Sequence, residues 1–161
     1  MKARGRNSII RKANIEDIPE LVRIRLAYLN EDYQGLKEEQ ICELKAQLSE
    51  YFVKHIGKEL IAFIAEEDKE IIASVFLLVI EKPANPHFMK GRIGELLNVY
   101  TKTENRRQGI ASKLIKLAIE EAKDMLLSYL SLNATEVGYP LYKKLGFEEV
   151  QSDYISMKYM L

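Results

Sequence analysis

The part of the sequence with the clearest chemical character is the segment from Thr103 to Ala111. It contains two adjacent arginines, Arg106 and Arg107, followed closely by Gly109. Arginine carries a permanent charge and forked donors that suit phosphate oxygens, and glycine lets a ligand approach the backbone. The segment lacks both the Gly-Lys-Ser/Thr of nucleotide-hydrolase P-loops and the three-glycine dinucleotide fingerprint. It therefore predicts a diphosphate site of another kind, with an ordinary solvated turn as the alternative interpretation.

This segment lies between a predicted strand, Ile93–Thr101, and a predicted helix, Gly109–Lys123, whose apolar residues recur at helical spacing. A helix that begins directly after the loop points its free N–H groups at an anion. A further strand at Leu126–Leu132 completes a right-handed crossover, which makes the two strands parallel. In open sheets of this kind, ligands bind beyond the carboxyl ends of the strands.

The rest of the chain alternates between helical and strand patterns in a way that defines a fold class. The other predicted elements are strands at Ser8–Lys12, Leu60–Ala65 and Ile71–Ile80, helices at Ile15–Asn30, Lys37–Ile56 and Tyr139–Leu145, a loop at Lys82–Gly91 and a last strand at Phe147–Met160. The predicted order is β-α-α-β-β-β-α-β-α-β, an α/β (mixed α+β) fold in which helices sandwich a central mixed sheet. We expect one domain over residues 8–161 and a flexible N-terminus over residues 1–7.

Composition narrows the class of protein. The chain has 161 residues, and its 24 basic side chains balance 24 acidic ones. A general nucleic-acid binder usually carries a basic excess, so we expect no nucleic-acid partner. No apolar run has the length of a membrane span, and no signal region follows the basic start, which favours a cytoplasmic protein without a membrane partner. Cys42 is the only cysteine, which excludes an internal disulfide and a cysteine-cluster zinc site; we expect no metal.

Two motifs together resemble a known family. Arg106-x-x-Gly109-x-Ala111, directly after a strand and at the start of a helix, resembles the acyl-CoA pyrophosphate motif of the GCN5-related N-acetyltransferases (the GNAT superfamily). The segment Leu141-Tyr142-Lys143-Lys144-Leu145-Gly146-Phe147 resembles the family's Leu-Tyr-x-x-x-Gly-Phe. The element order also matches, from Ser8 to the C-terminus. The resemblance implies an N-acetyltransferase that moves an acetyl group from acetyl-CoA to a primary amine of a small molecule or peptide, by direct attack in a ternary complex.

The resemblance also implies where acetyl-CoA lies. The strand backbone at Leu97, Val99 and Thr101 would bind the pantetheine arm, and the pyrophosphate would lie against Arg106, Arg107, Gln108, Gly109, Ile110, Ala111 and Ser112. Many members have an asparagine seven residues before the tyrosine, where this chain has Thr135, so nearby Asn133 is the substitute. The proline that often precedes the loop motif is absent, with Thr103 in that region.

Acetyl transfer to an amine needs a base, a stabilised carbonyl oxygen and a proton for the leaving thiolate. The resemblance makes Glu95 the base, directly or through a water, since many members have a glutamate eleven residues before the loop motif. Alternation along the strand puts Glu95 on an otherwise apolar face, which also fits a structural ion pair or a surface charge. Tyr142 is the implied general acid, because a phenol of pKa about 10 is protonated at neutral pH; core packing is the alternative. A backbone amide of strand 93–101 is the expected oxyanion donor.

The acceptor amine is expected to approach the first two helices. The residues expected to line the acceptor site on this side are Arg25, Tyr28, Leu29, Glu31, Asp32 and Tyr33. We select Tyr28 and Tyr33 as substrate-binding residues, together with His87 in the loop before the catalytic strand. A solvated helix end and an exposed loop histidine are the alternatives. Cys42 is in the middle of a helical stripe, which predicts a core residue and not a nucleophile.

Other functions and assemblies stay open at this point. A non-catalytic acyl-CoA-binding regulatory module would keep the loop without turnover, and an unrelated phosphate-binding α/β module would bind nucleotides. Dimers are common in the superfamily, formed through the C-terminal strand or a sheet edge. A homodimer is therefore compatible with the resemblance, although the sequence has no decisive interface signal.

Overall fold

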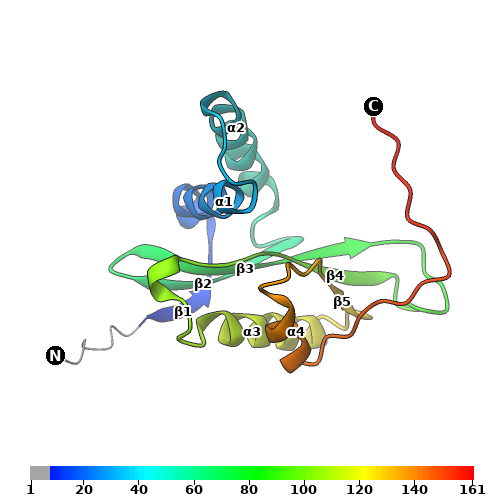
Figure 1. Cartoon of the computed structure of the whole chain (residues 1–161). Helices are drawn as coiled ribbons and strands as arrows, with labels where there is room; N and C mark the ends of the chain where they lie inside the picture. Colours follow the sequence, from blue (N-terminus) through cyan, green and yellow to red (C-terminus); the bar gives the residue numbers. More distant parts are fainter. Residues whose placement is uncertain (1–7) are drawn as a thin grey trace.

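The computed structural model describes residues 8–161, and the predicted flexible N-terminus over residues 1–7 lies outside them. The strands of the chain form one sheet, and the helices lie on both sides of it (Figure 1). The elements are β1 (Ile9–Lys12), η1 (Ile15–Asp17), α1 (Ile18–Asp32), α2 (Glu38–His55), β2 (Leu60–Glu67), β3 (Glu70–Glu81), β4 (Arg92–Thr101), η2 (Thr103–Asn105), α3 (Ile110–Asp124), β5 (Leu130–Ser131) and α4 (Tyr139–Lys144). The predicted mixed α/β fold is confirmed.

The sheet has the strand order β1-β2-β3-β4-β5. The first four strands are antiparallel, and β4 pairs with β5 in parallel, as the crossover predicted. β5 is much shorter than the predicted strand at Leu126–Leu132, because the first residues of that stretch finish α3. Leu126 has a positive φ of 57°, and the amide of Leu127 donates to the carbonyl of Ala122.

Helices cover both faces of the sheet, so the structure has two hydrophobic cores (Figure 1). On the α1 and α2 side, Phe52 is 1% exposed and meets Phe76 of β3 edge to face, with ring centroids 5.7 Å apart. On the α3 side, Leu114 and Ile115 are completely buried against the sheet. None of the helices within residues 8–161 is long and apolar enough to cross a membrane.

The predicted last strand, Phe147–Met160, is not formed. After α4 the chain runs away from the sheet in an extended, irregular path (Figure 1). Among the described residues, no backbone hydrogen bond joins residues 148–161 to a strand. The sequence pattern indicates only that a segment suits a strand, whereas a strand also needs a neighbour for its backbone groups. Its apolar side chains are left exposed, among them Tyr154 at 87% and Met157 at 92%.

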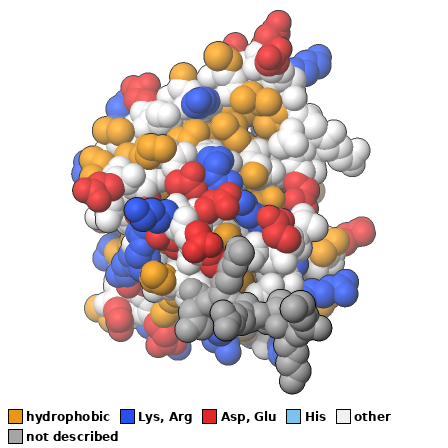
Figure 2. All heavy atoms as spheres, turned by 90° about the vertical axis from the view of Figure 1, so that its left-hand side faces the viewer, with side chains coloured by type: hydrophobic (Ala, Val, Ile, Leu, Met, Phe, Trp, Pro, Cys, Tyr) orange, Lys and Arg blue, Asp and Glu red, His pale blue; other side chains and the backbone are white. Residues whose placement is uncertain are grey.

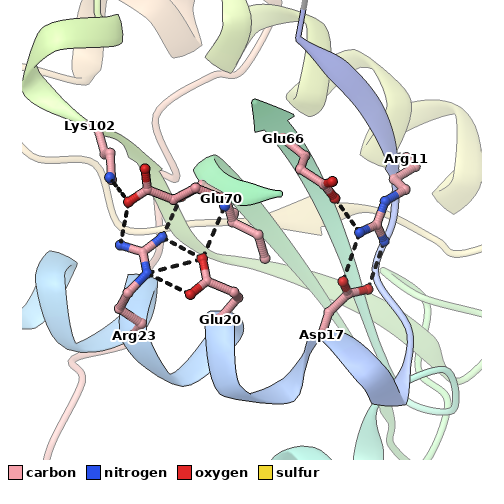
Figure 3. A network of polar contacts seen from close by, with 8 residues as sticks. Arg11, Asp17, Glu20, Arg23, Glu66, Glu70 and Lys102 are labelled. Atoms are coloured by element: carbon pink, nitrogen blue, oxygen red, sulfur yellow. Dashed lines mark hydrogen bonds and ion pairs between the residues drawn. The ribbon is translucent and has the colours of Figure 1, made fainter. Parts of the chain in front are cut away.

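Two groups of ion pairs fix the start of α1 to the sheet (Figure 3). In the first, Arg11 of β1 donates to both carboxylate oxygens of Asp17 at 2.7 Å and also pairs with Glu66 of β2. The hydrogen bond from Arg11 lowers the pKa of the Asp17 carboxyl. Asp17 also accepts from the Asn14 amide, as part of a capping box at the start of η1.

The second group joins α1 to β3 and to the residue after β4. Glu20 and Arg23 pair with each other and with the backbone of Ile71, through the Arg23 guanidinium (2.7 Å) and the Glu20 carboxylate (3.2 Å). Glu70 pairs with Arg23 at 3.7 Å and with Lys102 (Figure 3). These contacts fix the position of α1 relative to the end of β4, where the loop that leads to α3 begins.

Candidate active site

The middle of β4 contains a bulge at Asn98. This residue has a positive φ of 50°, and the register with β3 shifts between Ser74 and Phe76. Asn98 is only 3% exposed, and its side-chain amide donates to the Ser74 hydroxyl at 2.8 Å. The Ser74 hydroxyl in turn donates to the Asn98 carbonyl at 3.3 Å. A buried polar pair thus holds the strand in a conformation that a regular strand would not adopt.

The bulge changes which side chains of β4 share a face. Leu96 and Val99 pack in the core on the α3 side, whereas Leu97 and Tyr100 pack on the α1 side. Residues of one face are thus three apart across Asn98 instead of two, as in a regular strand. The predicted regular alternation through Glu95, Leu97 and Val99 is wrong beyond Leu97 for this reason.

The β4 edge that faces β5 is open over much of its length. The two strands pair only at Gly94 with Leu130 and at Glu95 with Ser131. From Leu96 to Thr101, this edge of β4 has no partner strand among residues 8–161. Apart from the Thr101 carbonyl, which accepts from Arg106, its backbone groups are therefore available to an extended ligand that lies beside the strand. The stretch includes the three residues that the resemblance assigns to the pantetheine arm.

The loop after β4 leads directly to the N-terminus of α3. Arg107 has a φ of 61° and Gly109 a φ of 76°, so the backbone turns sharply before the helix begins at Ile110. A Cβ atom added at Gly109 would meet nothing within 4 Å, so the space beside this residue is open. The first N–H groups of α3 have no partner within the helix, and such groups attract anions.

Arg106 reaches from this loop to α1. Its Nε donates to the Thr101 carbonyl at 2.8 Å, and its Nη2 pairs with both oxygens of Glu31 at 2.6 and 2.8 Å. Its guanidinium also lies 5.7 Å from the ring centroid of Tyr100. The sequence could not indicate the pairing with Glu31, which joins residues 75 positions apart.

Tyr142 lies on α4 and belongs to the core on the α3 side of the sheet. It is 9% exposed, its ring meets Phe147 edge to face at 5.9 Å, and a Cβ atom at Gly138 would come within 3.0 Å of the ring. Burial raises the pKa of the Tyr142 phenol to about 12, with a smaller contribution from Tyr28 of α1. Tyr142 therefore stays protonated at physiological pH. Tyr28 also meets Tyr100 edge to face at 6.1 Å, so side chains of α1 and β4 gather here.

Comparisons with known proteins fit this geometry. A model of the acetyltransferase (GNAT) domain matches residues 58–149. The chain belongs to the GNAT family. It is 31% identical to a predicted acetyltransferase from Clostridium acetobutylicum, solved with acetyl-CoA, with a TM-score of 0.83 over 94% of this chain and 96% of that one. It is also 25% identical to an N-alpha-acetyltransferase of Saccharolobus solfataricus, over 93% of this chain and 86% of that protein. A GCN5-related N-acetyltransferase from Ralstonia eutropha JMP134 has the same fold, with a TM-score of 0.78 and 24% identity over 94% of this chain and 99% of that one.

Features of the GNAT chain fit acetyl-CoA. Open space at Gly109 lies at the start of α3, where a diphosphate needs it. The Thr101 hydroxyl, at the end of the open strand edge, is buried without a hydrogen-bond partner among the described residues.

On the face shown in Figure 2, acidic and basic side chains are interspersed, as the balanced composition led us to expect.

Glu95 and the other predicted side chains differ in their surroundings. Glu95 is half-buried between Leu78 of β3 and Ser131 of β5, and its carboxylate makes no ion pair with any described residue. This argues against the interpretation as a structural ion pair. Asn133 is exposed, whereas the Thr135 hydroxyl accepts from the amide of Gly138 at the start of α4.

The remaining predictions concern Tyr33, His87 and Cys42. Tyr33 is 67% exposed at the end of α1. His87 is exposed in the loop between β3 and β4, where its backbone amide donates to Asn85. The prediction that Cys42 is a core residue is wrong, since Cys42 is exposed. In α2 only Leu48 and Phe52 are buried, because the helix lies in the outer layer and contacts the sheet through its second half.

Sequence reasoning did not identify the polar pair at the bulge. Two signals were available for it. Ser74 interrupts the apolar run Ile71–Ile80, and Asn98 is a poor strand former inside a predicted strand.

Proposed function

We propose that this chain transfers the acetyl group of acetyl-CoA to a primary amine by direct attack in a ternary complex. The observation that carries the proposal is the open edge of β4, which runs from the bulge at Asn98 to the phosphate loop before α3. An extended cofactor arm fits along such an edge, with its diphosphate at the helix N-terminus. When bound, acetyl-CoA supplies an activated acyl group as a thioester.

The chain's own groups supply the rest of the chemistry. Glu95 accepts the proton that the attacking amine must lose, directly or through a water. Backbone N–H groups at the bulge stabilise the negative charge that develops on the acetyl oxygen. The amine nitrogen forms the new C–N bond, the C–S bond breaks, and Tyr142 donates its proton to the departing sulfur. Burial raises the pKa of Tyr142, so the phenol carries its proton when the sulfur departs.

The names of two relatives support a peptide amine as the acceptor. Two archaeal relatives, each 25% identical, are named N-alpha-acetyltransferases. A peptide amine is therefore the first acceptor to test, ahead of small amines. The alternative is a non-catalytic acyl-CoA-binding module, which would show binding without turnover.

The first test is a melting experiment with acetyl-CoA, CoA and ATP, followed by an amine panel. A ligand that binds only the native state raises the melting temperature by mass action. We expect acetyl-CoA and CoA to raise it and ATP to have little effect, and we expect release of the CoA thiol with at least one peptide or small amine. No shift with acetyl-CoA at high excess would refute the proposal. A shift without thiol release from any amine would favour the non-catalytic alternative.

We also propose that two copies associate through the segment after α4. Its exposed large apolar side chains are Val150, Tyr154, Ile155, Met157, Tyr159, Met160 and Leu161. Ile155, Met157 and Tyr159 alternate, so they would share one face of a strand. β5 ends the sheet with an unpaired edge, and such edges accept further strands. A second copy offers the same segment and the same edge, which permits a reciprocal, self-complementary exchange.

Light scattering coupled to size exclusion tests this association. We expect twice the chain mass for the full chain and a single chain mass for the I155K/M157K variant, because two charges on the apolar face prevent burial. The Lys158→Glu variant changes a charge on the opposite face and should remain a dimer. A full chain that is monomeric at every concentration would contradict the proposal.

A further inference from the structure

Arg25 of α1 is half-buried and has no carboxylate partner. Among residues 8–161, the other half-buried or paired arginines each lie within 4.0 Å of a carboxylate: Arg11, Arg23, Arg92 and Arg106. Arg107 is exposed in the phosphate loop. Arg25 instead makes one long hydrogen bond, from Nη1 to the Asn98 side-chain oxygen at 3.3 Å, and its guanidinium lies 5.4 Å from the ring centroid of Tyr28.

A half-buried guanidinium with no carboxylate within ion-pair distance is an unusual arrangement. Burial lowers the pKa of Arg25, and Tyr28 and the more distant Asp32 act in the opposite direction, yet a guanidinium does not lose its proton in proteins. Burying a charge is costly unless it is paired. None of the Arg25 nitrogens is both buried and without a partner, so its unused donors reach solvent. The charge is therefore open to a ligand from the α1 side.

The position of Arg25 relates it to the acceptor. Asn98, its hydrogen-bond partner, forms the bulge at the open edge of β4. The diphosphate end of the cofactor would lie on the other side of the sheet, at α3, and the side of α1 is left for the acceptor. Tyr28 lies beside Arg25, and Tyr100 lies against Tyr28, so this region has aromatic surface.

We infer that Arg25 binds a carboxylate of the acceptor, so that the preferred substrate is an amine that carries an acidic group close to the reacting nitrogen. This inference rests on the proposed acetyl transfer and specifies its substrate class. Amino-acid-like amines and peptides with an acidic residue next to the N-terminus both satisfy it. A guanidinium suits a carboxylate because its forked donors match the two oxygens.

The test compares acceptors that differ only in a carboxylate-to-amide change. One pair consists of a free amino acid and its amide, and the other of peptides that begin Ser-Glu and Ser-Gln. We expect the wild-type chain to favour the acidic member of at least one pair by about tenfold or more in kcat/KM. In Arg25→Gln, which keeps a donor for Asn98, this preference should fall to about one, mainly through KM. Arg25→Lys should keep part of it.

Arg23→Gln is the matched control, because Arg23 lies on the same helix and its charge is already paired with Glu20. This variant should keep the wild-type preference. Equal kcat/KM for both members of each pair in the wild type would overturn the inference. An equal loss for both members in Arg25→Gln would overturn it as well, since Arg25 would then act on the reaction and not on the acceptor.

A binding measurement separates this inference from the proposed function. N-acetylated acid and amide products are titrated in the presence of CoA, with the melting temperature as the readout. The acid should raise the melting temperature more than the amide in wild type, and equally in Arg25→Gln. No acetylation of any acceptor would refute acetyl transfer alone, whereas equal shifts for acid and amide in wild type would refute the role of Arg25 alone.

Discussion

Replacing Tyr142 by phenylalanine is expected to lower kcat about 100-fold, the effect typical of losing a general acid or base. The affinity for acetyl-CoA should stay within about twofold, because the ring remains. The Tyr142 hydroxyl has no hydrogen-bond partner among the described residues, so the variant should fold with nearly unchanged stability. Steady-state kinetics and a melting curve give both quantities.

Tyr139→Phe is the control for this experiment. Tyr139 lies on the same helix, but it is 39% exposed and its hydroxyl pairs with Glu149. Its loss should leave kcat unchanged. A fall in kcat of less than threefold for Tyr142→Phe would show that the leaving sulfur obtains its proton elsewhere.

The raised pKa of Tyr142 also has a consequence for the pH dependence of kcat. The pKa of Tyr142 is raised to about 12, so the phenol stays predominantly protonated up to about pH 10. A decline of kcat between pH 8 and about pH 10 would therefore not arise from Tyr142. The Tyr142→Phe variant should keep the shape of the wild-type profile in that range.

Replacing Arg106 by alanine is expected to weaken acetyl-CoA binding by about 10- to 100-fold, the usual effect of losing hydrogen bonds to a charged group. Calorimetric titration measures this affinity, and the loss should shrink at high salt because screening weakens the contact. Arg106 has two ways to act. It can bind the diphosphate, or it can hold the loop in place through Glu31 and Thr101.

Glu31→Gln separates the two roles of Arg106. This variant removes the ion pair at 2.6 Å but keeps the arginine. If Arg106 binds the diphosphate, Glu31→Gln should keep or improve the affinity, since the guanidinium no longer has a competing carboxylate. An affinity loss as large as that of Arg106→Ala would show that Arg106 acts by holding the loop to α1.

The sequence predicted the parts of the site that depend on local spacing. The segment from Arg106 to Gly109 lies between β4 and α3 as expected, because glycine, arginine and apolar periodicity are signals that depend on only a few neighbouring residues. The bulge was missed because it depends on the backbone angles of Asn98 and on a buried contact with Ser74, 24 residues away. The pairing of Arg106 with Glu31 was missed for the same reason.

The wrong predictions have related causes. The pattern of residues 147–160 is typical of a strand, but hydrogen-bond partners come from the tertiary arrangement and not from the segment itself. Cys42 follows helical periodicity, but which part of α2 meets the sheet depends on how the helix crosses it. Both errors concern long-range geometry, whereas the three long helices occur where helices were predicted.

The bulge at Asn98 also determines how β4 tolerates mutation. In a saturation scan of a regular strand, the apolar requirement recurs at every second position. Here Leu96 and Val99 belong to one core and Leu97 and Tyr100 to the other. Because the bulge adds one residue to β4, deletion of Asn98 would remove the bulge and leave the later side chains of the strand on their present faces. A sequence comparison that aligns β4 without a gap to a strand that lacks the bulge would, beyond Asn98, pair residues that serve different layers of the protein.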